Sequence, residues 1–101
     1  MTLYERELMD KPSYRSESCP VCGRPATNQH HVVYRSHGGG NGPTISLCGF
    51  GNASGCHGLA HRHMLHFRYH GGWQFRFTDE PVGEMTALEL PGWRYLPGEG
   101  S

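Results

Sequence analysis

The chain has 101 residues, of which 36% are hydrophobic, so it is predicted to form a single domain with a modest core. Its formal net charge is zero, no run of residues is long and apolar enough to span a membrane, and the charged N-terminus lacks the apolar stretch of a signal peptide. These features argue against a membrane partner, and we expect a cytoplasmic protein in a reducing compartment.

The neutral total hides a segregation of charge along the chain. Residues 18–78 contain five arginines, all eight histidines and no Asp or Glu, so this segment carries +5 with its histidines neutral. Residues 1–17 carry three basic and four acidic side chains, and residues 79–101 carry one and five, which gives −1 and −4. An acid-free segment rich in arginine suits a phosphate-bearing partner. The plainer interpretation is that acidic residues are simply not needed there.

The chain divides into three predicted parts. Residues 1–17 are predicted to be an N-terminal appendage with a short helix that ends near Pro12. Residues 18–78 are predicted to be the core together with a C-terminal β-hairpin. Residues 79–101 are predicted to be a tail that Trp93 and Tyr95 pin to the core.

Four cysteines frame the predicted core. The run Cys19-Pro20-Val21-Cys22-Gly23 has the composition of a tight metal-binding turn, which we call the knuckle. Residues 29–34 and 44–48 are predicted strands, and the second one delivers Cys48. In a reducing compartment, two such cysteine pairs indicate a closed tetrahedral zinc site of structural type, with the ligands Cys19, Cys22, Cys48 and Cys56. The alternative is that one or more of them are buried free thiols.

The histidines suggest a second site of a different kind. A helix is predicted over residues 55–64, which puts His57 and His61 on one face, one turn apart. His30 and His31 lie on a predicted strand, where neighbours point to opposite faces, so one of them can join the helical pair at a metal ion. The other imidazole is then available as a base for a water molecule. After the helix, residues 65–69 and 73–77 alternate aromatic and polar side chains and predict the hairpin.

This combination of motifs, CPVCGRPATNQHHVVYRSHGGG followed by TISLC and CHGLAH, resembles the HNH endonuclease family. The resemblance covers residues 19 to about 64. It implies a small α+β fold with a ββα-metal core (the His-Me finger) and a four-cysteine zinc knuckle, to which the predicted C-terminal hairpin of residues 65–77 is added. It also implies a metal-dependent DNA endonuclease that hydrolyses phosphodiester bonds. Since the predicted helix is taken up by metal ligands and no other recognition helix is predicted, we expect little sequence specificity, and we expect nicking from a monomer or weak dimer.

The family's site residues carry over to numbered positions of this sequence. The resemblance implies that His30, His57 and His61 bind the one catalytic divalent ion, which could be Mg²⁺, Mn²⁺, Ni²⁺ or Zn²⁺. It further implies that His31 is the general base and that Arg35 contacts the phosphate. His37, Arg68 and Arg76 are further candidates for contact with the DNA backbone. A protein partner could supply specificity, and the setting would be a bacterial or phage-infected cell.

Two positions depart from the family pattern, and two other functions stay open. The family's asparagine falls at Pro43, with Asn41 as the nearest substitute, and the second cysteine pair is spaced C-x7-C. Pro43 is the main argument for an alternative, a catalytically lapsed zinc module that binds nucleic acid without cutting. A third possibility is a metal-storage or sensing protein, which would leave the charge segregation unexplained.

Overall fold

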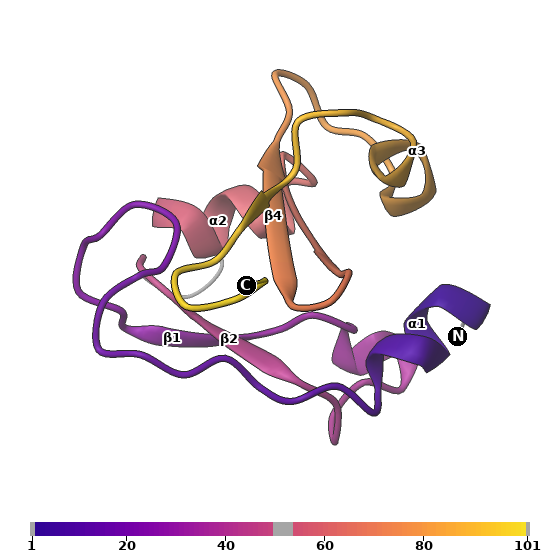
Figure 1. Cartoon of the computed structure of the whole chain (residues 1–101), viewed down its shortest axis with the longest axis horizontal. Coiled ribbons are helices and arrows are strands. Elements are labelled where there is room, and N and C mark those ends of the chain that lie inside the picture. Colours follow the sequence, from indigo (N-terminus) through magenta and orange to yellow (C-terminus); the bar gives the residue numbers. More distant parts are fainter. Residues whose placement is uncertain (1, 50–53, 101) are drawn as a thin grey trace.

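The computed structural model describes residues 2–49 and 54–100. The elements follow in the order α1 (Leu3–Leu8), β1 (Asn28–His31), the 3-10 helix η1 (Arg35–His37), β2 (Thr44–Leu47), α2 (Gly55–His61), β3 (Leu65–Tyr69), β4 (Trp73–Phe77), α3 (Glu84–Leu88) and β5 (Arg94–Tyr95). The chain is thus a small α+β protein with two antiparallel sheets, whose strands run across one another with α2 beside them (Figure 1). None of the helices in the described ranges is long and apolar enough to cross a membrane.

Strands β1 and β2 form the first sheet. They pair antiparallel, with His30 opposite Ile45 and His31 opposite Thr44. The predicted strand over residues 29–34 is shorter than expected, because regular pairing stops at His31. The chain turns after Val33, whose carbonyl oxygen lies so close to Gly39 that a Cβ there would be 1.9 Å away. This close approach of two backbone segments bends the end of the run into η1.

Helix α2 is also shorter than its predicted range of residues 55–64. It ends at His61, and His63 adopts a left-handed backbone with φ 61°. That conformation cannot continue a right-handed helix, so the chain turns directly into β3. The shortening leaves His57 and His61 within the helix, one turn apart, as the sequence predicts.

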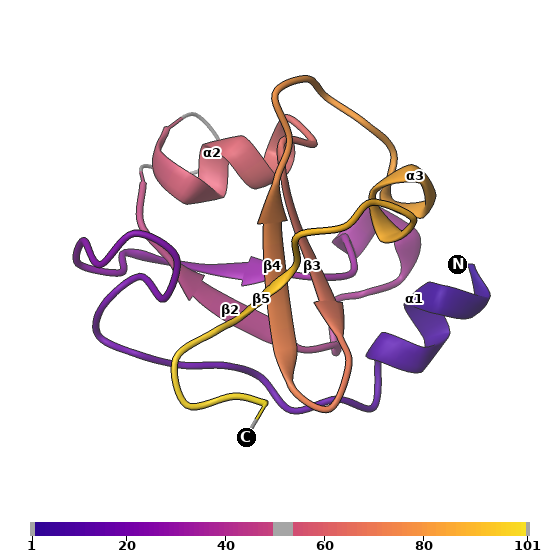
Figure 2. The same cartoon turned by 45° about the horizontal axis from the view of Figure 1, so that its top comes forward.

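The predicted hairpin is confirmed as β3 and β4, with Leu65 opposite Phe77 and Tyr69 opposite Trp73. The tail adds two short elements to it that the sequence did not indicate. Strand β5 pairs with β4, and α3 packs against β3 (Figure 2). The tail is held further by the Leu96 N–H, which donates to the Trp73 carbonyl at 3.0 Å.

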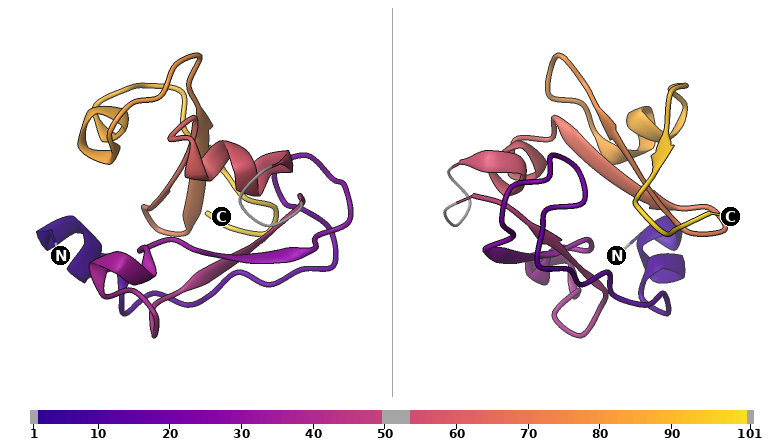
Figure 3. Two further views of the ribbon diagram at one scale, coloured as in Figure 1. Left: turned by 180° about the vertical axis from the view of Figure 1, so that it is seen from behind. Right: turned by 60° about the vertical axis from the view of Figure 1, so that its left-hand side comes forward.

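The N-terminal segment, predicted as an appendage, makes several contacts with the body. The Tyr4 hydroxyl donates to the Phe67 carbonyl at 2.9 Å, and the Trp73 indole N–H donates to the Pro12 carbonyl at 2.7 Å. Leu8, which lies between Tyr4 and Pro12 in the sequence, is buried in the core with 3% of its surface exposed. Further along, Tyr14 forms a parallel bridge to Ile45 at the edge of the first sheet. Helix α1 therefore lies against the molecule, on the side away from α2 (Figure 3).

Candidate functional site

Four cysteines from three parts of the chain converge on one point. Cys19 and Cys22 lie on the knuckle, where the Gly23 N–H donates to the Cys19 carbonyl at 2.9 Å. Cys48 follows β2 and Cys56 lies in the first turn of α2. Their four sulfur atoms lie within 4.8 Å of one another, and all four are free thiols, with Cys22 the exposed member. This donor set can hold a metal such as zinc, because it supplies four soft ligands in a closed cluster.

The charges within the cysteine cluster are already arranged for metal binding. A hydrogen bond from the Cys56 thiol lowers the pKa of Cys19 against the effect of burial, and backbone N–H groups lower it further. The same contact and burial raise the pKa of Cys56. The cluster therefore favours one thiolate before any ion is bound, and the thiolate is the form of cysteine that binds metals.

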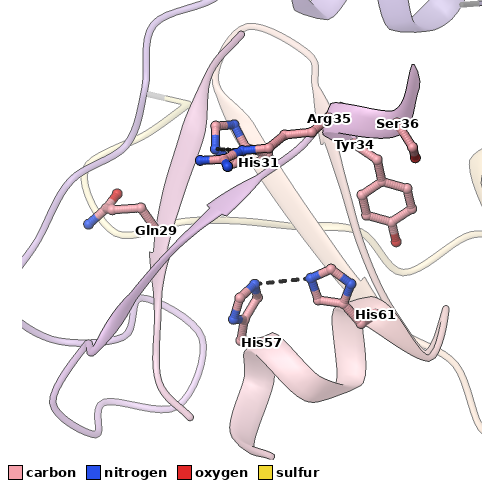
Figure 4. A pocket seen from close by; sticks show the side chains of 7 residues that line it. All are labelled: Gln29, His31, Tyr34, Arg35, Ser36, His57 and His61. Atoms are coloured by element: carbon pink, nitrogen blue, oxygen red, sulfur yellow. Dashed lines mark hydrogen bonds between the residues drawn. The ribbon is translucent and has the colours of Figure 1, made fainter. Parts of the chain in front are cut away.

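Three histidines form a second group of potential ligands. One ring nitrogen from each of His30, His57 and His61 lies within 4.8 Å of the others. The two helical members face each other, with their Nε2 atoms 3.1 Å apart (Figure 4). Two nitrogens bound to one tetrahedral zinc ion are roughly 3.3 Å apart, since each Zn–N bond is about 2.0–2.1 Å. The spacing therefore fits two imidazoles that share one ion.

The third histidine is held in the form that binds metals. His30 is 3% exposed, and burial, followed by the charges of His57 and His61, lowers the pKa of His30 to about 3. Burial and then the charge of His63 lower the pKa of His61. A neutral imidazole keeps the lone pair that a metal needs. The His30 Nδ1 atom is buried, and no residue in the described ranges gives it a hydrogen bond.

An open pocket of about 500 Å³ lies beside the helical histidines. Its lining residues come from β1, η1 and α2 and are Gln29, His31, Tyr34, Arg35, Ser36, His57 and His61. His31 and Arg35 face the two helical histidines across this space (Figure 4). The Arg35 Nε donates a hydrogen bond to the His31 Nε2 at 3.3 Å, so this nitrogen acts as the acceptor in the contact.

The remaining candidate residues lie away from the pocket. His37 Nδ1 pairs with the Glu5 carboxylate at 2.8 Å, and Asn41 is exposed in the turn before the buried Pro43. Arg68 donates to the Gln74 side chain at 2.6 Å, and its guanidinium lies 4.6 Å from the centroid of the Trp93 ring. Arg76 donates to the Pro91 carbonyl. The structure thus brings Arg35 to His31 and places His37, Arg68 and Arg76 in contacts that join different parts of the fold.

Tyr34 and Gln29 line the pocket, although sequence reasoning gave neither a role in the site. The Tyr34 ring stacks on His61, with the centroids 5.5 Å apart and the planes at 14°, and its hydroxyl donates to the Ala60 carbonyl at 3.2 Å. Gln29 exchanges hydrogen bonds with Ser46 and Thr44 across the sheet. The period of two along the strand could have placed Gln29 on the face of His31, whereas nothing in the sequence indicates the stacking of Tyr34.

We compared the chain with protein-family models, with curated protein sequences and with solved structures. No family model matches it, and neither comparison with known proteins gives a match. The geometry of the cysteine cluster, the three histidines and the pocket beside them is therefore the structural basis for a function.

Proposed function

We propose that the protein is a metal-dependent DNA endonuclease in which β1, β2 and α2 form a ββα-metal core. The observation that carries the proposal is the convergence, in and beside one pocket, of three imidazoles, which can share an ion, with a separate histidine and an arginine. The sequence resemblance to HNH endonucleases assigns the same residues to these roles. Few other functions need both a metal-ligand set and an unliganded base that is paired with a guanidinium.

The two ligand groups suit different tasks. Four cysteine ligands would fill every position of a tetrahedral ion, so an ion held by this cluster would have no position for a substrate and would be structural. The three histidines leave at least one position of an ion open to the pocket. A divalent ion bound there would stabilise the negative charge that builds on the phosphate and on the leaving oxygen.

The protein's own residues would supply the base and the phosphate contact. His31 accepts a hydrogen bond from Arg35 at Nε2, so this nitrogen can take the proton of an attacking water once Arg35 releases it. A phosphate oxygen is a better partner for a guanidinium than a neutral imidazole is. We infer that Arg35 moves to the substrate phosphate on binding, which frees His31 to act as the general base at that moment.

We propose that the protein binds DNA through the phosphate backbone. Of the α-helices in residues 2–49 and 54–100, only α2 lines the pocket, and it carries the proposed metal ligands, so we propose contact with the DNA backbone and little reading of bases. One site cuts one strand, which makes nicking the expected product for a monomer. The four free thiols and the family resemblance support the cytoplasm of a bacterial or phage-infected cell as its location.

The test is a supercoiled-plasmid nicking assay. The protein is chelated mildly, its retained zinc is measured, and Mg²⁺, Mn²⁺, Ni²⁺ or Zn²⁺ is then added. We expect metal-dependent open-circular product, and we expect His31→Ala to lower the rate by about 100-fold or more, since a general base contributes about 10²–10⁴. His70→Ala is the matched control, because His70 is exposed in the hairpin turn and lines no part of the pocket.

One observation favours the second candidate, a zinc module that binds nucleic acid without cutting it. Pro43 occupies the position of the family's asparagine, is buried, and has no side-chain amide to orient the base. Across the sheet from His31 stands Thr44, whose hydroxyl is bonded to Gln29. If folded, zinc-containing protein shifts DNA in a gel yet cuts with none of the four ions, the lapsed module is the correct function.

A further inference from the structure

Two grooves meet at Phe77, on a part of the surface that the proposed active site does not use. One groove, of about 480 Å³, lies between the cysteine cluster and the end of α2 and is lined by Arg24, Leu59 and Arg62 among others. The other, of about 320 Å³, lies along β4 and β5 and is lined by Arg76 and Arg94. Phe77 lines both grooves, so they adjoin one another at this side chain. We call the two grooves and Phe77 together the Phe77 surface.

The Phe77 surface is strongly basic. Arg24, Arg62 and Arg94 are exposed, and no acidic side chain from residues 2–49 or 54–100 lines either groove. In that same part of the chain, neither Arg24 nor Arg94 forms an ion pair. The arginines thus come from the knuckle, the end of α2 and the tail, three places far apart in the sequence. Together they form a positive surface that attracts a polyanion.

An exposed aromatic ring lies at the centre of these charges. Phe77 ends β4 and is 45% exposed, and its ring lies edge-on to the ring of Phe75, with the centroids 6.0 Å apart. A phosphate backbone alone has no use for an exposed ring, whereas an unpaired base stacks on one. Arginines that hold phosphates around an aromatic platform are the usual composition of a surface for single-stranded nucleic acid.

The Phe77 surface lies on a different side of α2 from the histidine pocket. His57 and His61 line the pocket, whereas Leu59 and Arg62 line the groove, and at 3.6 residues per turn these pairs point away from each other. The end of β4 that carries Phe77 lies near α2 (Figure 2). A nucleic-acid strand bound on the Phe77 surface would therefore lie close to the proposed active site without entering it.

We propose that the Phe77 surface binds single-stranded DNA, with an unpaired base stacked on Phe77 and neighbouring phosphates held by Arg24, Arg62 and Arg94. The substrate of the proposed nuclease would then be DNA with an unpaired segment next to the cut, such as a flap or a displaced strand. This second step rests on the proposed function, whereas the binding itself does not.

Binding is measured by fluorescence anisotropy in the His31→Ala background, where cutting cannot remove the ligand. The probes are a labelled single-stranded oligonucleotide and a duplex of the same length, each titrated at several salt concentrations. We expect Phe77→Leu to weaken single-strand binding by at least about fivefold and to leave duplex binding nearly unchanged. Phe77→Trp keeps a stacking ring and should bind the single strand at least as tightly as the parent.

The salt dependence tests the arginines one at a time. Arg24→Ala and Arg94→Ala should each lower the slope of log affinity against log salt by about 0.7, the value for one phosphate contact to a single strand. Arg6→Ala is the matched control, because Arg6 is an exposed arginine on α1, away from both grooves. Unchanged melting temperatures would show that each variant is folded.

Two results would overturn the proposal. One is a Phe77→Leu protein that binds the single strand as tightly as its parent, and the other is an Arg6→Ala protein that loses as much of the slope as the groove variants. Nicking is scored separately, on the plasmid. Phe77-dependent binding without nicking would reject the nuclease and keep this surface, and nicking without Phe77-dependent binding would do the reverse.

Discussion

Glu5 is a nearly buried charge whose partners come from two parts of the chain. It is 4% exposed and accepts hydrogen bonds from the Thr2 N–H at 3.0 Å and from His37 Nδ1 at 2.8 Å. Burial alone would raise the pKa of Glu5, but the hydrogen bonds from Thr2 and His37 and the charge of His37 outweigh it and lower the pKa below 4.5. The carboxylate therefore ties α1 to η1, the turn that also carries Arg35.

The lowered pKa gives this contact a defined pH dependence. Because the folded-state pKa lies below the unfolded one, the ionised group stabilises the fold above about pH 4.5, and this is lost as the pH falls through the folded-state value. Glu5→Gln should lower the free energy of unfolding by about 1 kcal/mol at pH 7 and by much less near pH 3. The effect is modest because the His37 side chain is 51% exposed, so water screens its contact with Glu5. The Glu5 charge also repels Glu84, whose pKa is raised first by burial and then by this repulsion.

Urea denaturation of the parent and the variant at both pH values measures this difference. Glu7→Gln, an exposed change on the same helix, is the control and should have little effect at either pH. If Glu5→Gln lowered the free energy of unfolding equally at pH 7 and pH 3, the shape of the Glu5 side chain, and not its charge, would hold α1 to η1.

Among the elements, the cysteine cluster joins α2 to β2, the strand that pairs with the histidine-bearing β1. Cys48 follows β2 and Cys56 lies in the first turn of α2, and the Cys56 N–H donates to the Cys48 sulfur at 3.4 Å. An ion held by both would fix the direction in which α2 leaves the sheet. That direction decides whether His57 and His61 reach His30, so an ion held by the cysteines would also position the proposed catalytic site.

Loss of one thiolate should therefore affect both sites. We expect Cys48→Ser to lower the bound zinc and to reduce the free energy of unfolding by at least about 3 kcal/mol, since structural zinc binds with about 10–16 kcal/mol. Zinc analysis and thermal unfolding by circular dichroism measure the two effects. The control is Ser18→Ala, at an exposed serine beside the knuckle. A Cys48→Ser protein with full zinc and an unchanged melting temperature would rule out a structural role for the cluster.

The sequence predicts elements well where a local pattern is strong. The alternation in residues 65–77 predicts β3 and β4 with their ends, and the i, i+4 spacing places His57 and His61 together. Prediction from the sequence fails where contacts between distant segments determine whether a helix or strand forms and where it ends. Strand β1 stops early because Val33 meets Gly39, and α3 and β5 are too short for a periodic signal and depend on packing around Ala87 and Leu96.

The same limit applies to the arginines of the hairpin. Contact of Arg68 and Arg76 with the DNA backbone stays a prediction, and no local pattern could show that the tail reaches both guanidiniums. The position of Arg94 beside Arg76 is likewise set by the pairing of β5 with β4. Contacts between residues far apart in the chain thus determine which arginines remain on the surface.

At the scale of the molecule, Trp73 joins the two ends of the chain to the hairpin. It is fully buried, its indole N–H donates to the Pro12 carbonyl, and its backbone bonds to Leu96 and to the Glu99 side chain. Few residues of a chain this short are in contact with so many separate segments. The molecule, measuring 32 × 32 × 29 Å, should therefore unfold as one unit.

Trp73→Phe tests this arrangement. The change removes the hydrogen bond to Pro12 and should cost about 1 kcal/mol or more, which corresponds to a fall in melting temperature of about 4–8 °C. The control is Trp93→Phe, because the indole N–H of Trp93 is buried without a hydrogen-bond partner in the described part of the chain, so no hydrogen bond is lost. Equal losses from both changes would mean that the contact with Pro12 contributes little.

The segment between Cys48 and Cys56 is closed at its base by the backbone. A Cβ on Gly49 would lie 2.0 Å from the Ser54 carbonyl oxygen, and one on Gly55 would lie 2.7 Å from the Gly49 Cα. The His57 N–H also donates to the Cys48 carbonyl at 3.1 Å. The two cysteines are thus brought together by contacts that do not depend on how many residues separate them. This explains why the C-x7-C spacing still yields a compact sulfur cluster.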